Sequence, residues 1–417
     1  MNTIPKKMKA LCLKGKGEKN LQLCDVPVPL PEKGQILCRV DACTACASDT
    51  KLVDQGGDHS LVYNWDTEKY PLIVGHEASL TVVKSGPDVE EEYPAGTRCA
   101  LQPAIDAPPI HNRERYINNG LGIEKIAVGY TLPGTMAEYV LLTEEVISTG
   151  CLLPLPDSTI PHFAVCLTEP FSCVVSAQER MVHFYKNSPE QTALPASGVK
   201  QGGITVIIGA GPMGIMHTEI ALTGKPKTII VSELIKERRD NLQNNFKNHP
   251  GKQNTEIMAT HPDQLEIHLK SMTESGGADD IIIASGSAKL QEYSLGLLAK
   301  NGVANFFGGT KAGESQINVD TRRIHYDSIT MVGTSGGDPS HVACVLSLLK
   351  EKKINPGSYI SAVGGMNAAL PLLKEVRNQN LNGKGVIYPH INYPLGFVEK
   401  WDAEKEKGIY PLANSEC

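Results

Sequence analysis

The chain has 417 residues, of which 41% are hydrophobic and 21% are charged, and its formal net charge is −6. This length is too great for one ordinary core, so the sequence predicts two domains of a globular protein. The acidic balance argues against a nucleic-acid partner, and the longest apolar stretch, ITVIIGAGPMGIM, is too short to span a membrane.

Eleven cysteines are scattered along the chain, an odd number that does not suit a disulfide framework. Such usage is typical of a reducing compartment, where thiols are core residues or metal ligands. The N-terminal stretch has no apolar region long enough for a signal peptide. We therefore expect a cytoplasmic protein.

Residues 8–170 consist mostly of short strand-like runs separated by Pro and Gly, which indicates a β-rich domain. Two stretches within it, 54–70 and 105–130, are predicted to be long surface loops.

The stretch CTACASDTK, residues 43–51, carries Cys43, Cys46, Ser48 and Asp49. Taken alone, the cysteine pair fits a redox dithiol, half of a zinc knuckle, or one metal ligand beside an uninvolved thiol. A zinc knuckle needs a second Cys-x-x-Cys, and the chain has none.

Two further stretches offer metal ligands. VGHEAS supplies His76 and Glu77, and LTEPFSC supplies Glu169 and Cys173. A thiolate such as Cys46 with an imidazole and a carboxylate would hold a catalytic zinc that keeps one position open for substrate. Each stretch alone is weak evidence for a metal site, and the three stretches together are stronger evidence.

From residue 203 strands alternate with helices, which predicts βαβ units and a parallel, doubly wound α/β sheet. The strands are expected at 204–210, 227–233, 255–260, 279–285 and 302–309, and the helices at 212–224, 234–246, 262–275 and 288–299. The remaining chain offers helices near 338–351 and 367–377 and strands at 359–363 and 384–389, and we expect it to return to the first domain.

The stretch GAGPMG follows a strand and begins a helix, as in a dinucleotide-binding turn. Gly209 permits the tight turn, Gly211 lets a pyrophosphate approach the backbone, and Gly214 lets the helix pack closely on the strand. Pro212 and Met213 complete the cofactor-binding segment.

Glu233 ends the next strand, 24 positions after Gly209, and would accept hydrogen bonds from the adenosine ribose. NAD is therefore favoured. Lys236, Arg238 and Arg239 lie close by and leave NADP as an alternative, although they also fit an exposed first helical turn.

The stretches CASD, GHE, EPFSC and GAGPMG together resemble the zinc-containing medium-chain alcohol and polyol dehydrogenases. The stretches DQGGDH, GPMG, NFFGG and VGTSGG make the chain most similar to the L-sorbose-1-phosphate reductase type. The resemblance implies a GroES-like catalytic domain over 1–172, a Rossmann domain over 173–333, and a segment 334–417 that returns to the catalytic domain.

The same resemblance implies that Cys46, His76 and Glu169 bind zinc, with Glu77 coordinating directly or through water. Asp49 would orient His76. Relatives often bind a structural zinc through four cysteines, but residues 95–130 hold only Cys99, so one catalytic zinc and no structural zinc are expected.

The implied reaction moves a hydride between NAD(P) and the secondary alcohol or ketone of a polyol or sugar phosphate, such as L-sorbose 1-phosphate or sorbitol 6-phosphate. Ser48 would pass the alcohol proton, and Lys51 stands where relatives often have a relay histidine. The resemblance also implies a homo-oligomer, a dimer or tetramer, for which the SITMVG strand offers a pairing edge.

Two other functions remain open. The same ligand set fits an L-threonine or other amino-alcohol dehydrogenase, and the scaffold fits a non-catalytic NAD-binding regulator. A substrate phosphate would call for basic side chains, for which the candidates are Arg113, Arg115, Arg322 and Arg323. These arginines also fit ordinary surface ion pairs.

Overall fold

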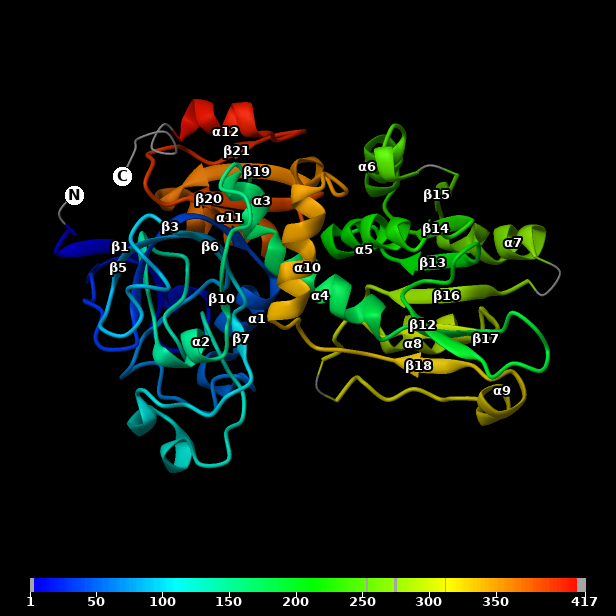
Figure 1. Ribbon diagram of the computed structural model, residues 1–417, viewed down its shortest axis with the longest axis horizontal. Coiled ribbons are helices and arrows are strands. Elements are labelled where there is room, and N and C mark those ends of the chain that lie inside the picture. The colour runs from blue at the N-terminus through cyan, green and yellow to red at the C-terminus, as the bar shows by residue number, and fades with distance from the viewer. Residues whose placement is uncertain (1–3, 253, 274–275, 312, 411–417) are drawn as a thin grey trace. The chain divides into compact units, whose positions relative to one another are not determined.

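The structure is a computed structural model that describes residues 4–252, 254–273, 276–311 and 313–410. The chain divides into two compact units (Figure 1). Unit 1 takes Met1–Ser172 with Gly337–Cys417, and unit 2 takes Cys173–Gly336. Among the described residues, no helix is long and apolar enough to cross a membrane.

Unit 1 is built around a mixed eight-stranded sheet with the order β10-β6-β5-β3-β20-β19-β21, and β9 also pairs with β3. Strand β3 has nine of its ten residues buried, and helices α3 and α11 pack against it. The strands are β3 (Ile36–Ala45), β5 (Glu77–Ser85), β6 (Arg98–Leu101), β9 (Tyr139–Leu142), β10 (Leu152–Pro154), β19 (Ile360–Gly365), β20 (Lys384–Tyr388) and β21 (Gly396–Phe397).

The C-terminal part of the chain extends this sheet. Strand β20 runs antiparallel to β3, with Gly385 opposite Ala45, and β19 runs parallel to β20. One buried core contains Leu80 of β5 and Leu372 of helix α11. Side chains far apart in the sequence therefore share the interior of unit 1.

The other elements of unit 1 surround that sheet. The remaining strands are β1 (Lys7–Leu13), β2 (Leu21–Pro27), β4 (Leu72–Ile73), β7 (Ala104–Ile105) and β8 (Ile126–Ala127). The helices are α1 (Ala47–Gln55), α2 (Glu144–Ser148), α3 (His162–Cys166), α10 (Pro339–Lys350), α11 (Ala369–Arg377) and α12 (Ala403–Ile409), and α4 (Thr168–Glu179) crosses the unit boundary. Short 3-10 turns are η1 (Glu18–Asn20), η2 (Gly56–Asp58), η3 (Arg113–Arg115), η4 (Ile117–Gly120), η6 (Pro356–Tyr359) and η7 (Met366–Ala368).

Unit 2 contains a six-stranded sheet with the order β15-β14-β13-β16-β17-β18, in which every pairing is parallel. This is the strand order of a Rossmann sheet, with the first strand, β13, at the point where the order reverses. The strands are β13 (Ile204–Ile208), β14 (Thr228–Ser232), β15 (Glu256–Thr260), β16 (Ala278–Ile283), β17 (Leu298–Asn305) and β18 (Thr330–Val332).

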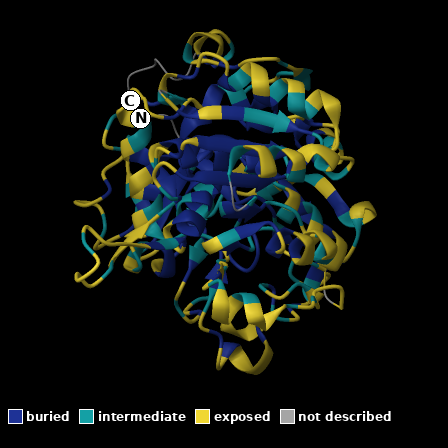
Figure 2. Cartoon of the chain, turned by 90° about the vertical axis from the view of Figure 1, so that its right-hand side faces the viewer, coloured by how far each residue is buried: buried dark blue, intermediate teal, exposed yellow. Residues whose placement is uncertain are grey.

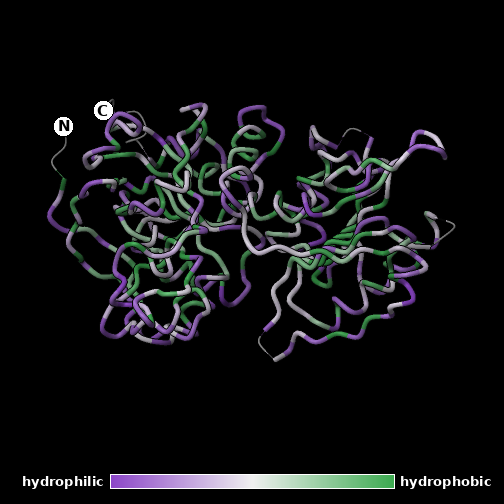
Figure 3. Tube along the Cα trace, turned by 60° about the horizontal axis from the view of Figure 1, so that its bottom comes forward, coloured by the Kyte–Doolittle hydropathy of each residue, from purple (hydrophilic) through white to green (hydrophobic). Residues whose placement is uncertain are grey.

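Hydrophobic runs explain these buried strands. All five residues of β13 and of β14 are buried, as expected for a parallel sheet covered on both faces. The strands are green in the hydropathy view (Figure 3) and form dark blue bands beside exposed helices (Figure 2). The helices of unit 2 are α5 (Pro212–Thr223), α6 (Lys236–Phe246), α7 (Pro262–Met272), α8 (Ala288–Leu295) and α9 (Thr321–Tyr326), and η5 (Pro250–Lys252) is a short 3-10 turn. Strands β11 (Val182–Tyr185) and β12 (Leu194–Ser197) form a separate two-stranded ribbon.

Two predicted boundaries in unit 2 are wrong. The helix expected over 288–299 ends at Leu295, because Gly296 closes its last turn and Leu298 already pairs with β16. The strand expected over 302–309 accordingly begins earlier, at Leu298, and ends at Asn305.

The predicted surface loops of unit 1 have an interior of their own. Trp65 and Tyr116 are buried, with ring centroids 5.5 Å apart, and the Arg115 guanidinium lies 5.2 Å from the Trp65 ring and 4.9 Å from the Tyr70 ring. These stretches are largely irregular, as predicted, but Trp65 and Tyr116 are not at the surface, because the aromatic side chains pack against one another.

Candidate functional site

Cys46 lies at the junction of β3 and helix α1, where its extended backbone makes it the residue that caps the helix. Its side chain accepts a hydrogen bond from the backbone N–H of Asp49, and the Asp49 carboxylate accepts one from the Cys46 N–H at 2.9 Å. Negative charge is favoured at a helix N-terminus. The local fold therefore suits Cys46 as a thiolate ligand.

His76 immediately precedes β5 and is buried. Its Nδ1 lies 3.0 Å from Asp49 Oδ1, and its Nε2 lies 3.1 Å from Ser48 Oγ. Asp49 thus orients His76 as well as bonding to Cys46. A hydrogen bond from Nδ1 leaves the Nε2 lone pair for a metal, which is the arrangement of a histidine ligand.

The electrostatic surroundings of His76 are strongly negative. Burial alone would lower the pKa of its imidazole. The Asp49 carboxylate and the nearby Tyr130 and Cys46 side chains raise the pKa by more than burial lowers it, so the net shift is upward. A cation at this position, whether a proton or a metal ion, is therefore favoured by its neighbours.

Glu77 begins β5 and is fully buried, opposite Thr44 in the β3–β5 register. Its carboxylate accepts hydrogen bonds from the Thr44 hydroxyl and, at 2.7 Å, from Lys384 Nζ. Burial lowers the pKa of Lys384, but the charges of Cys46, Glu77 and Glu169 outweigh it and raise the pKa. Lys384 therefore remains an ammonium ion in the interior.

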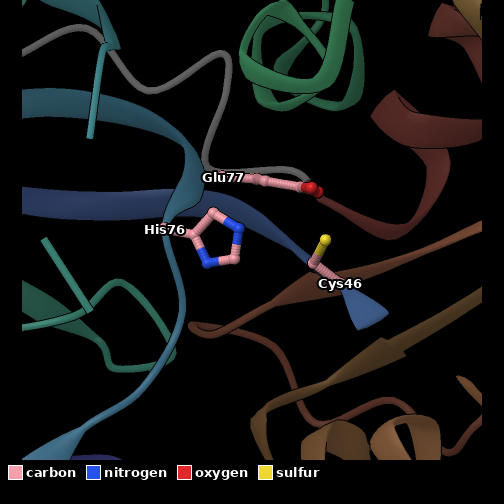
Figure 4. Close-up of side chains that lie close together, drawn as sticks. All are labelled: Cys46, His76 and Glu77. Atoms are coloured by element: carbon pink, nitrogen blue, oxygen red, sulfur yellow. The ribbon is translucent and has the colours of Figure 1, made fainter. Parts of the chain in front are cut away.

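Cys46, His76 and Glu77 each offer a ligand atom, and these atoms all lie within 4.8 Å of one another. Figure 4 shows the three side chains pointing toward a common point. Sulfur, imidazole nitrogen and carboxylate oxygen are the ligands that zinc takes in catalytic sites, and they suit zinc at this spacing.

Glu169 and Cys173, the other candidate ligands, lie half-buried on α4 and do not belong to this group. The Glu169 charge nevertheless contributes to the raised pKa of Lys384, so its carboxylate acts on the same region. Cys43 is fully buried, and burial raises its pKa, so it is a thiol of the core.

The sequence reading missed three residues around this group: Thr44, Tyr130 and Lys384. The Tyr130 ring centroid lies 5.8 Å from that of His76. Burial raises the pKa of the Tyr130 phenol to about 12, and a hydrogen bond with Ser48 opposes the rise. One signal was available for Lys384, because it begins the strand-like run KGVIY, where a lysine at the start of a buried strand suggests a paired cation.

In unit 2 the glycine-rich turn joins β13 to α5. Gly209 has a φ of +104°, which favours glycine, and a Cβ on Gly214 would lie 1.9 Å from the Gly209 carbonyl oxygen. A Cβ on Gly211 would meet no atom within 4 Å, so the space beside this backbone is open. Pro212 begins the helix, and the turn fits a pyrophosphate.

Glu233 lies just after β14 and is buried. Its carboxylate accepts hydrogen bonds from the backbone N–H of Ala210, at 2.8 Å, and of Ile235, at 2.9 Å. Arg239 donates to the carbonyl oxygens of Glu233 and Leu234, both at 2.7 Å. Glu233 thus anchors the turn itself, a role the sequence did not reveal.

Each of the four candidate arginines has contacts within its own unit. Arg323 donates to the carbonyl oxygen of Leu298 at 2.6 Å and contacts Asp327, all within unit 2. Arg322 lies over the Tyr326 ring, Arg113 donates to the Asn119 carbonyl oxygen, and Arg115 packs between aromatic rings as described above. These guanidinium groups contact neighbouring parts of the protein, and the arginine phosphate clamp stays a prediction.

Comparison with known proteins gives two matching family models. Residues 32–157 match the alcohol dehydrogenase GroES-like domain, and residues 212–351 match the zinc-binding dehydrogenase domain. These matches, with the parallel sheet of unit 2, confirm the predicted fold class.

Curated relatives match over nearly the whole chain. Mannitol-1-phosphate 5-dehydrogenase of Aliivibrio fischeri is 28% identical over 400 residues, which cover 94% of this chain and 89% of the relative. L-sorbose 1-phosphate reductase of Klebsiella pneumoniae is 26% identical over 387 residues, covering 91% and 88%. A zinc-binding dehydrogenase from Sinorhizobium meliloti 1021, solved bound to NADP, has the same fold, with a TM-score of 0.71 at 20% identity, covering 92% of this chain and all of that one.

Proposed function

Because this chain belongs to the zinc-containing medium-chain alcohol dehydrogenase family and is an NAD(P)-dependent oxidoreductase, we propose that its substrate is a polyol or a sugar phosphate. The enzyme would interconvert a secondary alcohol and a ketone. The observation that carries the alcohol–ketone chemistry is the convergence of Cys46, His76 and Glu77, with Asp49 bonded to two of them. The similarity to mannitol-1-phosphate 5-dehydrogenase and L-sorbose 1-phosphate reductase supports the substrate class.

For the metal we propose one zinc per chain, held by Cys46, His76 and a carboxylate. Glu77 is supported by its place in the group, and Glu169 is the alternative. A structural zinc is not expected, because Cys99 is the one cysteine of residues 95–130 and burial raises its pKa to about 12. Elemental analysis should give one zinc per chain, and two would contradict the assignment.

Zinc, when bound, acts as a Lewis acid that polarises the substrate oxygen and favours the loss of the alcohol proton. We propose that Ser48 relays that proton: its hydroxyl takes up the alcohol proton as it gives its own to the cofactor ribose or to water beyond. Its hydroxyl lies beside His76 Nε2 and hydrogen-bonds Tyr130. Asp49 keeps His76 in the orientation and tautomer that a ligand needs. Lys384 balances the negative charge of Glu77.

For the cofactor we propose NAD, bound at Gly209, Gly211, Pro212, Met213 and Gly214, with NADP as the alternative. The positive φ of Gly209 and the open space at Gly211 support pyrophosphate binding. The Glu233 carboxylate beside the turn supports NAD over NADP, because it would repel a 2′-phosphate.

The deciding experiment for the substrate is a panel assay of the zinc-loaded enzyme. Sorbitol, mannitol, their phosphates, L-sorbose 1-phosphate and L-threonine are assayed with NAD(H) and with NADP(H). Turnover of polyols or their phosphates supports the proposal. L-threonine as the best substrate would establish the amino-alcohol alternative, and NADH binding without zinc or turnover would establish a regulator.

We further propose a cytoplasmic homo-oligomer, a dimer or tetramer. All ten cysteines of the described ranges are free, which fits a reducing compartment. Strand β18 is at the edge of the unit 2 sheet and exposes Thr330 and Met331, so a second copy can pair there.

A further inference from the structure

A line of side chains leads away from the candidate metal ligands within unit 1. His76 contacts Tyr130, with ring centroids 5.8 Å apart, and Tyr130 contacts His59, with ring centroids 5.1 Å apart. Tyr130 thus contacts both His59 and His76, the proposed metal ligand, and links the two imidazoles within unit 1.

His59 presents a hydrogen-bond donor. Its Nδ1 accepts the backbone N–H of Leu61 at 3.2 Å, so the proton of the neutral ring is on Nε2. Burial, followed by the positive charge of Lys51, lowers the pKa of His59. The effect of Lys51 shows that its ammonium group lies near the imidazole.

The positive charge of Lys51 is not neutralised by the protein. Lys51 is exposed on α1, and within the described ranges its ammonium group has no ion-pair or hydrogen-bond partner. Two acids of the same region bond elsewhere, since Asp54 pairs with Arg377 at 2.6 Å and Asp58 with Lys16 at 2.7 Å. An ammonium and an imidazole N–H therefore remain available for an anion.

Building on the proposed function, we propose that Lys51 and His59 bind the phosphate of a polyol phosphate whose reacting carbon lies at Cys46, His76 and Glu77. A phosphate monoester accepts charge-assisted hydrogen bonds from both groups. Lys51 and His59 thereby take the role for which the arginines were candidates.

The test compares variants of the zinc-loaded enzyme. Lys51→Gln and His59→Gln are assayed with mannitol 1-phosphate and mannitol, and with sorbitol 6-phosphate and sorbitol. The readout is the ratio of kcat/KM for the phosphorylated over the unphosphorylated polyol, which a general loss of folding or activity does not change. Lys16→Gln is the matched control, because Lys16 lies in the same region but already pairs with Asp58.

Each variant should lower this ratio about ten- to a hundredfold, since a hydrogen bond to a charged group contributes roughly 1.5–3 kcal/mol. Lys51→Arg should retain most of the ratio, and Lys16→Gln should retain all of it.

An equal wild-type rate with and without phosphate, or a ratio that survives both variants, would overturn the assignment while leaving polyol oxidation intact. A raised KM for NAD(P) in Lys51→Gln with an unchanged ratio would instead assign Lys51 to the cofactor phosphates. If the wild-type enzyme oxidises no polyol in either form, the proposed function itself is wrong.

Discussion

Replacing Lys384 with methionine breaks the buried ion pair with Glu77. Both side chains are nearly inaccessible, with exposed fractions of 6% and 0%, and their charged atoms lie 2.7 Å apart. The variant leaves the Glu77 carboxylate buried, with the Thr44 hydroxyl as its remaining hydrogen-bond partner among the described residues. Removing one member of a buried pair costs roughly 3–5 kcal/mol, so we expect unit 1 to lose about that much stability.

Intrinsic tryptophan fluorescence can measure this loss of stability. Its two tryptophans, Trp65 and Trp401, are both buried in unit 1, so their fluorescence during urea unfolding reports on that unit. The measurement uses metal-free protein, because bound zinc would supply positive charge to Glu77. Lys374→Met is the control, since Lys374 forms a half-exposed pair with Glu18 at 3.2 Å and should cost less than about 1 kcal/mol.

The double variant Glu77→Gln/Lys384→Met separates the pair from other effects. It removes both charges, so it should be less destabilised than Lys384→Met alone. A loss below about 1 kcal/mol in Lys384→Met, or a double variant destabilised by the full sum of the single changes, would refute the reasoning.

Three further predictions concern activity, pH and assembly. Cys46→Ser should abolish activity and zinc binding while NADH still binds with nearly unchanged affinity, because the glycine-rich turn is in unit 2; parallel loss of NADH binding, by fluorescence titration, would contradict this. Burial lowers the pKa of His162 from 6.5 in the unfolded chain to about 4 in the folded protein. As the pH drops from about 6.5 toward 4, the unfolded chain therefore binds a proton that the folded protein does not, and the free energy of unfolding falls. The tryptophan-monitored loss between pH 7 and pH 5 from this group should be about 2 kcal/mol and should disappear in His162→Asn; an identical slope in both proteins would count against it. Light scattering should give a dimer or tetramer at micromolar concentration, and Met331→Lys on β18 should weaken it; a wild-type monomer is the opposing result.

Local sequence patterns were sufficient to predict part of this structure. The turn from Gly209 to Gly214 depends on backbone geometry within six residues, so its glycines could be interpreted from the sequence. The alternation of apolar strands and amphipathic helices likewise predicted the parallel sheet, because hydrophobic periodicity reflects local burial. Cys46 and Asp49 are three residues apart, and their mutual hydrogen bonds belong to one helix cap.

Contacts between distant residues were decided by the tertiary structure. Lys384 reaches Glu77 only because β20 pairs with β3, and no local pattern specifies which strand a returning segment joins. The grouping of Glu77 with Cys46 and His76, and the contacts of Arg323 within its own unit, depend in the same way on packing. A sequence records which side chains can bind a metal or an anion, but folding decides which of them meet, since burial and charge act on neighbours in space.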